Sequence, residues 1–249
     1  MADTLYLSLW YPNLRLASLP DKLVAVLEAF AAHGGDSKVY AATVWPVSWA
    51  ESPVVQHVYG RVAPLAELEA GLIEGRPVEQ GASRGAPPRL AVEQALELLH
   101  DDYAYEFQIG WSLWELETAP ASASGSAAEL PPQRRGPVAR DPGLGTGATS
   151  RWARAPQMVR VTGYGPLFDE GAYEQDGHIR IDFGSDAPFL EEDADLDKVG
   201  ARHVEENVRL LVELTAAVEK GSGATARLLW SELGESLAQR LAARLGVGN

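Results

Sequence analysis

Apolar and polar residues alternate with a period of two across residues 103–113. The odd positions are all apolar or aromatic, and the even positions include Glu106 and Gln108. Because successive side chains of a strand point to opposite faces, this alternation predicts a strand with one buried face and one polar face. The same alternation over shorter spans predicts strands at 158–164 and 178–184.

Three further strands are predicted from short runs of β-branched and aromatic residues, at 5–11, 38–49 and 225–230. Pro46 lies inside the second run. It is expected to bend or end that strand, since proline cannot donate a hydrogen bond to a sheet ladder.

Apolar residues at helical spacing predict the helices. The first helix starts at Ser18, whose side chain is expected to cap it, with Asp21 completing a capping box. It ends at His33, where two glycines follow. Four more helices are predicted at 64–74, 90–100, 204–218 and 235–245.

The order of these elements is β-α-β, two helices, β, and then β-β-α-β-α. Hairpins mixed with single crossovers predict an α+β fold, with a mainly antiparallel (mixed) sheet of about six strands and helices packed on one face. A β-α-β element in each half allows a ferredoxin-like duplication. Residues 119–150 are rich in Ala, Ser, Gly, Pro and Arg, so we expect a flexible insertion within a single domain that spans 1–249.

The chain is acidic, with 35 Asp and Glu against 21 Lys and Arg, a formal net charge of −14 and no cysteine. The lack of cysteine excludes disulfides, thiolate-ligated metals and thiol nucleophiles. The negative charge argues against a DNA-binding protein, because phosphate contacts need a basic surface. The first residues do not resemble a signal peptide and no apolar run is long enough to span a membrane, which together predict a cytoplasmic protein.

Most of the excess charge lies between Asp169 and Asp197, where eleven acidic residues and one basic residue, Arg180, give −10 over 29 residues. Carboxylates suit Mg²⁺ or Ca²⁺, and a histidine beside them suits Mn²⁺ or Zn²⁺. The candidate metal ligands are Asp169, Asp176, His178, Asp182 and Asp186. Three interpretations are open for this segment: a solvated acidic loop, a divalent-metal site, and a surface for a basic partner.

Charged residues also share the polar face of the predicted strands. His178, Arg180 and Asp182 lie on one side of their strand. Arg160 and Glu106 occupy the polar sides of 158–164 and 103–113. If these strands are neighbours, charges of both signs converge on one sheet face, which suits acid–base chemistry, anion recognition or plain cross-strand ion pairing.

Two of the seven tryptophans, Trp49 and Trp114, lie near strand ends or out of phase with the buried positions. Aromatic side chains concentrate binding energy at interfaces, so both are candidates for contacting a partner. The acidic candidates for the same contact are Asp169, Glu170, Glu174, Glu191, Glu192 and Asp193.

No catalytic triad, phosphate-binding loop or metal-binding signature stands out in the sequence, and whether the chain is an enzyme stays open. The leading hypothesis is a soluble acidic interaction protein of the immunity-protein or adaptor type, which binds a basic protein partner by charge complementarity. The alternative is a divalent-metal-dependent hydrolase that uses the Asp/Glu/His cluster at 169–186. Apart from that metal, the sequence indicates no cofactor, and it does not indicate an oligomeric state.

Overall fold

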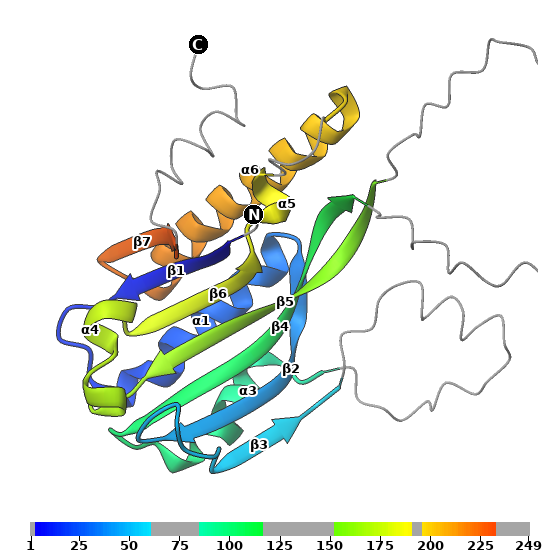
Figure 1. Ribbon diagram of the computed structural model, residues 1–249. Coiled ribbons are helices and arrows are strands. Elements are labelled where there is room, and N and C mark those ends of the chain that lie inside the picture. The colour runs from blue at the N-terminus through cyan, green and yellow to red at the C-terminus, as the bar shows by residue number, and fades with distance from the viewer. Residues whose placement is uncertain (1–2, 61–84, 117–151, 191–195, 233–249) are drawn as a thin grey trace, which may run out of the picture.

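A computed structural model describes residues 3–60, 85–116, 152–190 and 196–232 of the chain. Its strands are β1 (Thr4–Trp10), β2 (Gly35–Pro46), β3 (Val55–Val58), β4 (Tyr103–Leu116), β5 (Trp152–Tyr164), β6 (Ile179–Ser185) and β7 (Ala226–Ser231). They form one seven-stranded sheet in the order β3-β2-β4-β5-β6-β1-β7 (Figure 1). Every pair of neighbouring strands in it is antiparallel.

Three longer helices cover one face of this sheet: α1 (Leu19–Ala32), α3 (Pro88–Ala95) and α6 (Lys198–Ser222) (Figure 1). The core lies between them and the apolar sides of the strands, where Leu7, Phe107 and Ile181 are fully buried. The shorter turns are η1 (Leu16–Ser18), η2 (Leu96–Leu98), η3 (Phe168–Glu170), α4 (Tyr173–Asp176) and α5 (Ala187–Leu190). None of the described helices is long and apolar enough to cross a membrane.

The predicted α+β architecture is confirmed, and the sheet has one strand more than expected. The additional strand, β3, is four residues long and has no buried residue, so it leaves almost no hydrophobic pattern. β5 begins six residues before the predicted start because β4 pairs with it residue for residue as far as Leu116 and Trp152. The predicted end of β2 at Pro46 agrees with the structure.

The predicted capping box at the start of α1 is wrong. Ser18 has helical backbone angles, and its hydroxyl donates to the carbonyl of Arg15 at 2.7 Å instead of accepting from the helix. The chain enters α1 through η1, and Pro20 in the first turn has no N–H that needs an acceptor. The helices predicted at 64–74 and 235–245 and the insertion at 119–150 lie outside the described residues.

A ferredoxin-like duplication is not confirmed, because the two crossovers differ. The strands that α1 connects, β1 and β2, are separated in the sheet by β4, β5 and β6. The strands that α6 connects, β6 and β7, are separated by β1 alone. Two equivalent halves would give two equivalent separations.

β4 and β5 continue past the rest of the sheet as a two-stranded ribbon (Figure 1). β2 pairs with β4 only as far as Trp111, and the side chain of Asn207 on α6 then takes the place of a strand. Its Oδ1 accepts from the backbone N–H of Trp114 at 2.9 Å, and its Nδ2 donates to the carbonyl of Trp114 at 2.8 Å. A side-chain amide offers the same donor and acceptor as a peptide group, so Asn207 ties the ribbon to α6.

Candidate functional site

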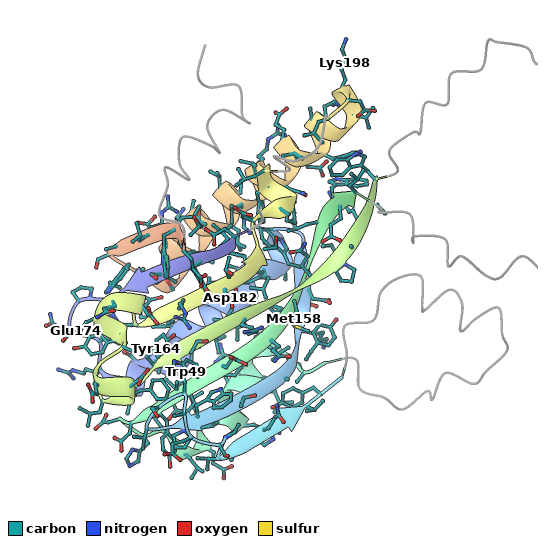
Figure 2. The ribbon with its side chains drawn as sticks, viewed as in Figure 1. Trp49, Met158, Tyr164, Glu174, Asp182 and Lys198 are labelled. Carbon is teal, nitrogen blue, oxygen red and sulfur yellow. The ribbon has the colours of Figure 1, made fainter. Side chains whose placement is uncertain are left out.

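The face of the sheet opposite the three long helices carries charged side chains from neighbouring strands. Glu106 lies opposite Thr162, which lies opposite Arg180, and on the adjacent rung Arg160 lies opposite Asp182. The structure therefore brings together four of the five residues proposed for the polar face, and Asp182 is labelled on it in Figure 2. The fifth, His178, precedes β6 and lies in a separate pocket, described below.

Ion pairs connect these charges. Arg160 Nη1 lies 3.6 Å from Asp182 Oδ2, and Arg180 Nη1 lies 2.5 Å from Asp176 Oδ2. The guanidinium of Arg180 also stands over the ring of Tyr6, 5.5 Å from its centroid. Each arginine is thus matched by a carboxylate, Arg160 across the strands and Arg180 from α4, which leaves little positive charge for an anion.

Glu106 is the carboxyl of this face whose ionisation is most altered. Burial raises the pKa of Glu106 above its ordinary value, because desolvation disfavours the carboxylate, and the attraction of Arg160 offsets this only in part. A neighbouring group behaves similarly: burial raises the pKa of the Tyr164 phenol, whose hydroxyl donates to Asp176 Oδ2 at 3.4 Å.

The acidic segment 169–197 is not one surface. Asp186 is buried and accepts from the backbone N–H of Asp3 at 2.9 Å. Asp197 caps α6 by accepting from the N–H of Gly200 at 2.7 Å. Asp182 accepts from the N–H of Gly184 at 2.8 Å, besides its pairing with Arg160. These three carboxylates have structural partners, as does Asp176 in its pairing with Arg180, so the described segment contributes chiefly the exposed Asp169, Glu170 and Glu174 to an acidic surface.

The five candidate metal ligands are likewise dispersed. Asp169 lies on η3, Asp176 is paired with Arg180, and His178 lies in its own pocket. Within the described part of the chain, no three His, Asp or Glu side chains are grouped as a metal ion would need.

A different acidic surface is created at one end of the sheet, where three segments meet: 46–51, 100–103 and 165–176. Backbone hydrogen bonds join them, from Val47 N–H to the carbonyl of Asp102 at 2.8 Å and from Asp169 N–H to the carbonyl of Val47 at 2.7 Å. A third runs from Leu167 N–H to the carbonyl of Asp101 at 2.9 Å. We call the acidic side chains of these segments the acidic end. They are Glu51, Asp101, Asp102, Asp169, Glu170, Glu174 and Asp176.

The three segments contain seven acids and no lysine or arginine, which is half of the formal net charge of −14. Five of the seven side chains are exposed, and Asp102 and Asp176 are half-buried. An open hollow of about 310 Å³ lies within one of the three segments, bordered by Asp169, Glu170, Gln175 and Asp176. The acidic end is therefore negative, and it is hollowed along residues 169–176.

Aromatic residues support the acidic end from beneath. Phe168 is buried, and the half-buried ring of Trp49 meets it edge-on at 5.1 Å and meets Tyr164 edge-on at 6.2 Å (Figure 2). Trp49 is thus mainly a packing residue that holds 46–51 against 165–176. The backbone here has left-handed φ values at Val47 (55°), Asp169 (46°) and Glu170 (55°), a conformation unusual for residues other than glycine and most unusual for β-branched valine.

Trp114, the other proposed contact residue, packs on α6. Its ring lies 3.9 Å from that of His203, and its Nε1 donates to Glu206 Oε2 at 3.0 Å. The guanidinium of Arg154 stands 5.0 Å from the Trp114 ring. These contacts hold the β4–β5 ribbon on α6 and lie at the other end of the sheet from the acidic end. The candidates Glu191, Glu192 and Asp193 lie outside the described residues.

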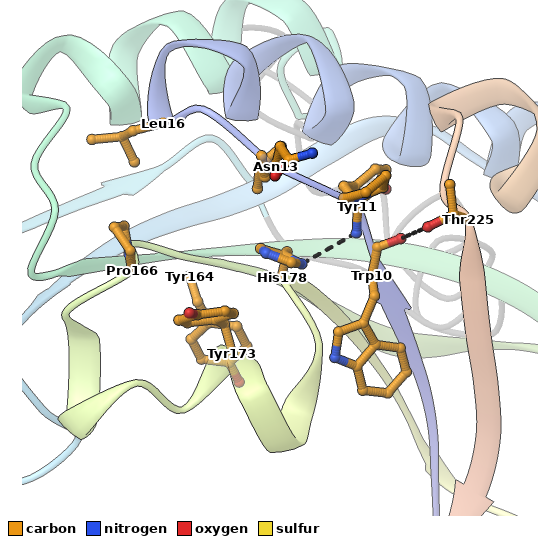
Figure 3. A pocket seen from close by; sticks show the side chains of 11 residues that line it. Trp10, Tyr11, Asn13, Leu16, Tyr164, Pro166, Tyr173, His178 and Thr225 are labelled. Carbon is orange, nitrogen blue, oxygen red and sulfur yellow. Dashed lines mark hydrogen bonds between the residues drawn. The ribbon is translucent and has the colours of Figure 1, made fainter.

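His178 borders a pocket that the sequence does not predict (Figure 3). This aromatic pocket has a volume of about 460 Å³, and its walls include Trp10, Tyr11, Tyr164 and Tyr173. The Nδ1 of His178 accepts from the backbone N–H of Tyr11 at 3.2 Å, so the neutral ring carries its proton on Nε2. Burial lowers the pKa of His178, which favours that neutral form at physiological pH.

Together, the fold and these surfaces define an α+β protein with an open antiparallel sheet, helices on one face, an acidic end and an adjoining aromatic pocket. No protein-family model, no curated protein and no solved structure matches the chain.

Proposed function

We propose that this protein is a soluble, cytoplasmic interaction protein that binds a basic protein partner, as an immunity protein or an adaptor does. The observation that carries the proposal is the acidic end, where three segments distant in sequence bring seven acidic residues to one end of the sheet, five of them exposed. Like charges at short range repel each other and weaken the folded state. A fold that brings five exposed acidic residues to one end of the sheet would be stabilised there by a bound cationic partner.

A protein partner fits this surface better than the other classes considered. DNA and RNA carry the same sign of charge as the acidic end and are repelled by it. A dense patch of one sign steers a basic protein into encounter and fixes its orientation. The left-handed residues Val47, Asp169 and Glu170 support the same reading, because backbone strain of this kind gathers at functional sites.

The test is affinity capture from the native host with the full chain and two triple variants. The first variant, Asp169→Asn/Glu170→Gln/Glu174→Gln, removes three exposed charges from the acidic end. The matched control, Glu93→Gln/Glu97→Gln/Glu213→Gln, removes three exposed charges elsewhere. We expect the wild-type chain and the control to capture a stoichiometric basic protein that the first variant loses.

Binding to the captured protein is then measured at increasing salt, and we expect the affinity to fall because exposed charges are screened. The proposal is overturned if the wild-type chain captures no stoichiometric basic partner. It is also overturned if both triple variants capture the partner equally well.

A further inference from the structure

The aromatic pocket adjoins the acidic end through α4. Tyr173 of this single turn lines the pocket, while Gln175 and Asp176 border the acidic hollow. The pocket opens between α4 and the segment that follows β1, with Trp10 on one side and Pro166 and Leu16 on the other (Figure 3). Its volume of about 460 Å³ falls within the range of ligand pockets, which is about 300–1,000 Å³.

The walls of the pocket are uncharged and rich in π-faces. Among the described residues that line it, none is Asp, Glu, Lys or Arg. The ring of Tyr173 lies 4.9 Å from that of His178, tilted by 32°, and Trp10 closes the side opposite Pro166 (Figure 3). The faces of aromatic rings are electronegative, and they attract a cation that comes within about 6 Å.

Acidic residues lie beside the pocket, although Asp176 is already paired with Arg180. Glu174 and Asp176 lie within three residues of Tyr173 on the same turn, and Glu174 is exposed. Burial lowers the pKa of His178 and its Nδ1 accepts from the N–H of Tyr11, and both favour the neutral ring, which does not repel a positive group. An uncharged apolar side chain would fit the same walls but would gain nothing from these carboxylates.

Two cations of the protein itself already use tyrosine rings of this region. Lys22 Nζ lies 5.3 Å from the centroid of Tyr11, and the guanidinium of Arg180 lies 5.7 Å from that of Tyr164. Neither cation is among the residues that line the pocket. Both have other partners, since Lys22 donates to the carbonyl of Ser222 at 2.6 Å and Arg180 pairs with Asp176.

We propose that the aromatic pocket receives a lysine or arginine side chain of the basic partner, held over the rings of Trp10 and Tyr173. The inference rests on the proposed function, because it makes the pocket the specific element of an interface whose attraction comes from the acidic end. Aromatic anchors of this kind supply specificity that charge alone lacks.

The pocket chemistry is tested without the partner, by NMR titration of the full chain with three small probes. These are the Nα-acetyl N-methylamides of lysine, arginine and norleucine, the last of which has an unbranched alkyl side chain and no charge. The indole N–H signal of Trp10, assigned by its loss in Trp10→Phe, is the readout. We expect the lysine or the arginine probe to bind about tenfold more tightly than the norleucine probe.

The variants Trp10→Leu and Tyr173→Leu are expected to weaken binding of the cationic probe about tenfold. In these variants, binding is measured from the NMR signals of the remaining pocket residues. The matched control is Trp230→Leu, which removes a tryptophan stacked on Tyr6 outside the pocket and is expected to leave probe binding unchanged. Equal binding of all three probes, or no perturbation of the Trp10 signal by any probe, overturns the inference.

The outcomes separate the two proposals. If the cationic probes bind the pocket but no basic partner is captured, the proposed function fails and the pocket is a cation site of another purpose. If a basic partner is captured and lost in the acidic-end variant, yet Trp10→Leu captures it as well as the wild-type chain, the function stands and the inference fails.

Discussion

Asn207 offers the sharpest test of how this fold is held together. It is fully buried on α6, and its side chain makes three hydrogen bonds: two with the backbone of Trp114 and one, from Nδ2 at 2.8 Å, to the carbonyl of Pro188. It therefore joins the β4–β5 ribbon, the α5 turn and α6 at one point. Asn207→Leu replaces the amide with an apolar side chain of similar size and removes all three hydrogen bonds.

The expected loss follows from these contacts. A neutral intramolecular hydrogen bond contributes about 1 kcal/mol net, so three give about 3 kcal/mol of the free energy of unfolding. The carbonyl of Pro188, a buried residue, then loses the Nδ2 donor, and a buried group left unsatisfied costs more than the average bond. For a chain of this size, about 3 kcal/mol corresponds to a fall in Tm of about 6–12 °C.

The measurement is urea unfolding of wild-type protein, Asn207→Leu and Arg209→Ala, followed by circular dichroism. Arg209 is exposed two residues further along α6 and pairs with Glu205 at 2.9 Å, so its replacement is expected to change stability by at most about 0.5 kcal/mol. A loss below about 1 kcal/mol for Asn207→Leu would refute the view that its side chain substitutes for a strand.

Three further changes have defined outcomes. Because the pKa of Glu106 is raised in the folded state, the folded wild-type protein binds this proton more tightly than the unfolded chain does. The resulting stabilisation is fully present below the ordinary pKa of 4.5 and is lost as the pH rises through the pKa of the folded state. Glu106→Gln should remove this loss of stability between pH 4 and pH 7, measured as the urea midpoint of unfolding. An equal change of the midpoint between the two pH values in both proteins would contradict this. Gly165→Ala would place Cβ 2.3 Å from the backbone carbonyl oxygen of Asp101, so we expect the free energy of unfolding to fall by about 2 kcal/mol. Because the change disturbs the acidic end without altering its charge, partner capture should weaken. Unchanged capture would argue against the acidic end as the binding surface. Trp111→Phe removes the hydrogen bond from Nε1 to the carbonyl of His33 at 2.8 Å and leaves a void in the core. Calorimetry should show that the free energy of unfolding falls by about 2 kcal/mol, and unchanged stability would contradict this.

The elements of the fold could be predicted from the sequence because the buried face of each strand or helix requires apolar residues at the spacing of that element. The odd positions of 103–113 that alternate in the sequence, such as Phe107, Ile109 and Trp111, are fully buried in the structure. The order of strands has no such local signal. Nothing in 5–11 states that β1 lies between β6 and β7, so the position of Tyr6 opposite Asp182 could not be predicted.

The candidate site was predictable in type but not in place. The polar face could be foreseen because Glu106, Arg160 and Arg180 have the right parity and their strands are neighbours. The arrangement of the acidic segment could not be predicted, because residues close in the sequence here lie on different parts of the folded protein. Asp186 turns inward to cap the backbone of Asp3, whereas Asp101, far away in sequence, joins residues 165–176 through backbone hydrogen bonds.

One short turn links the two proposed binding surfaces, and its position is set by the glycines on either side. Gly171 and Gly177 have φ values of 88° and 87°, which residues with a side chain rarely adopt. A Cβ on Gly177 would also lie 2.7 Å from the backbone nitrogen of Leu9, so this glycine lets the chain pass close to β1 before β6 begins. The same passage places Tyr173 in the aromatic pocket and Asp176 beside the acidic hollow. A basic partner that reaches both would therefore meet them at a fixed separation, which would make the spacing of its cationic residues, and not only its total charge, the basis of recognition.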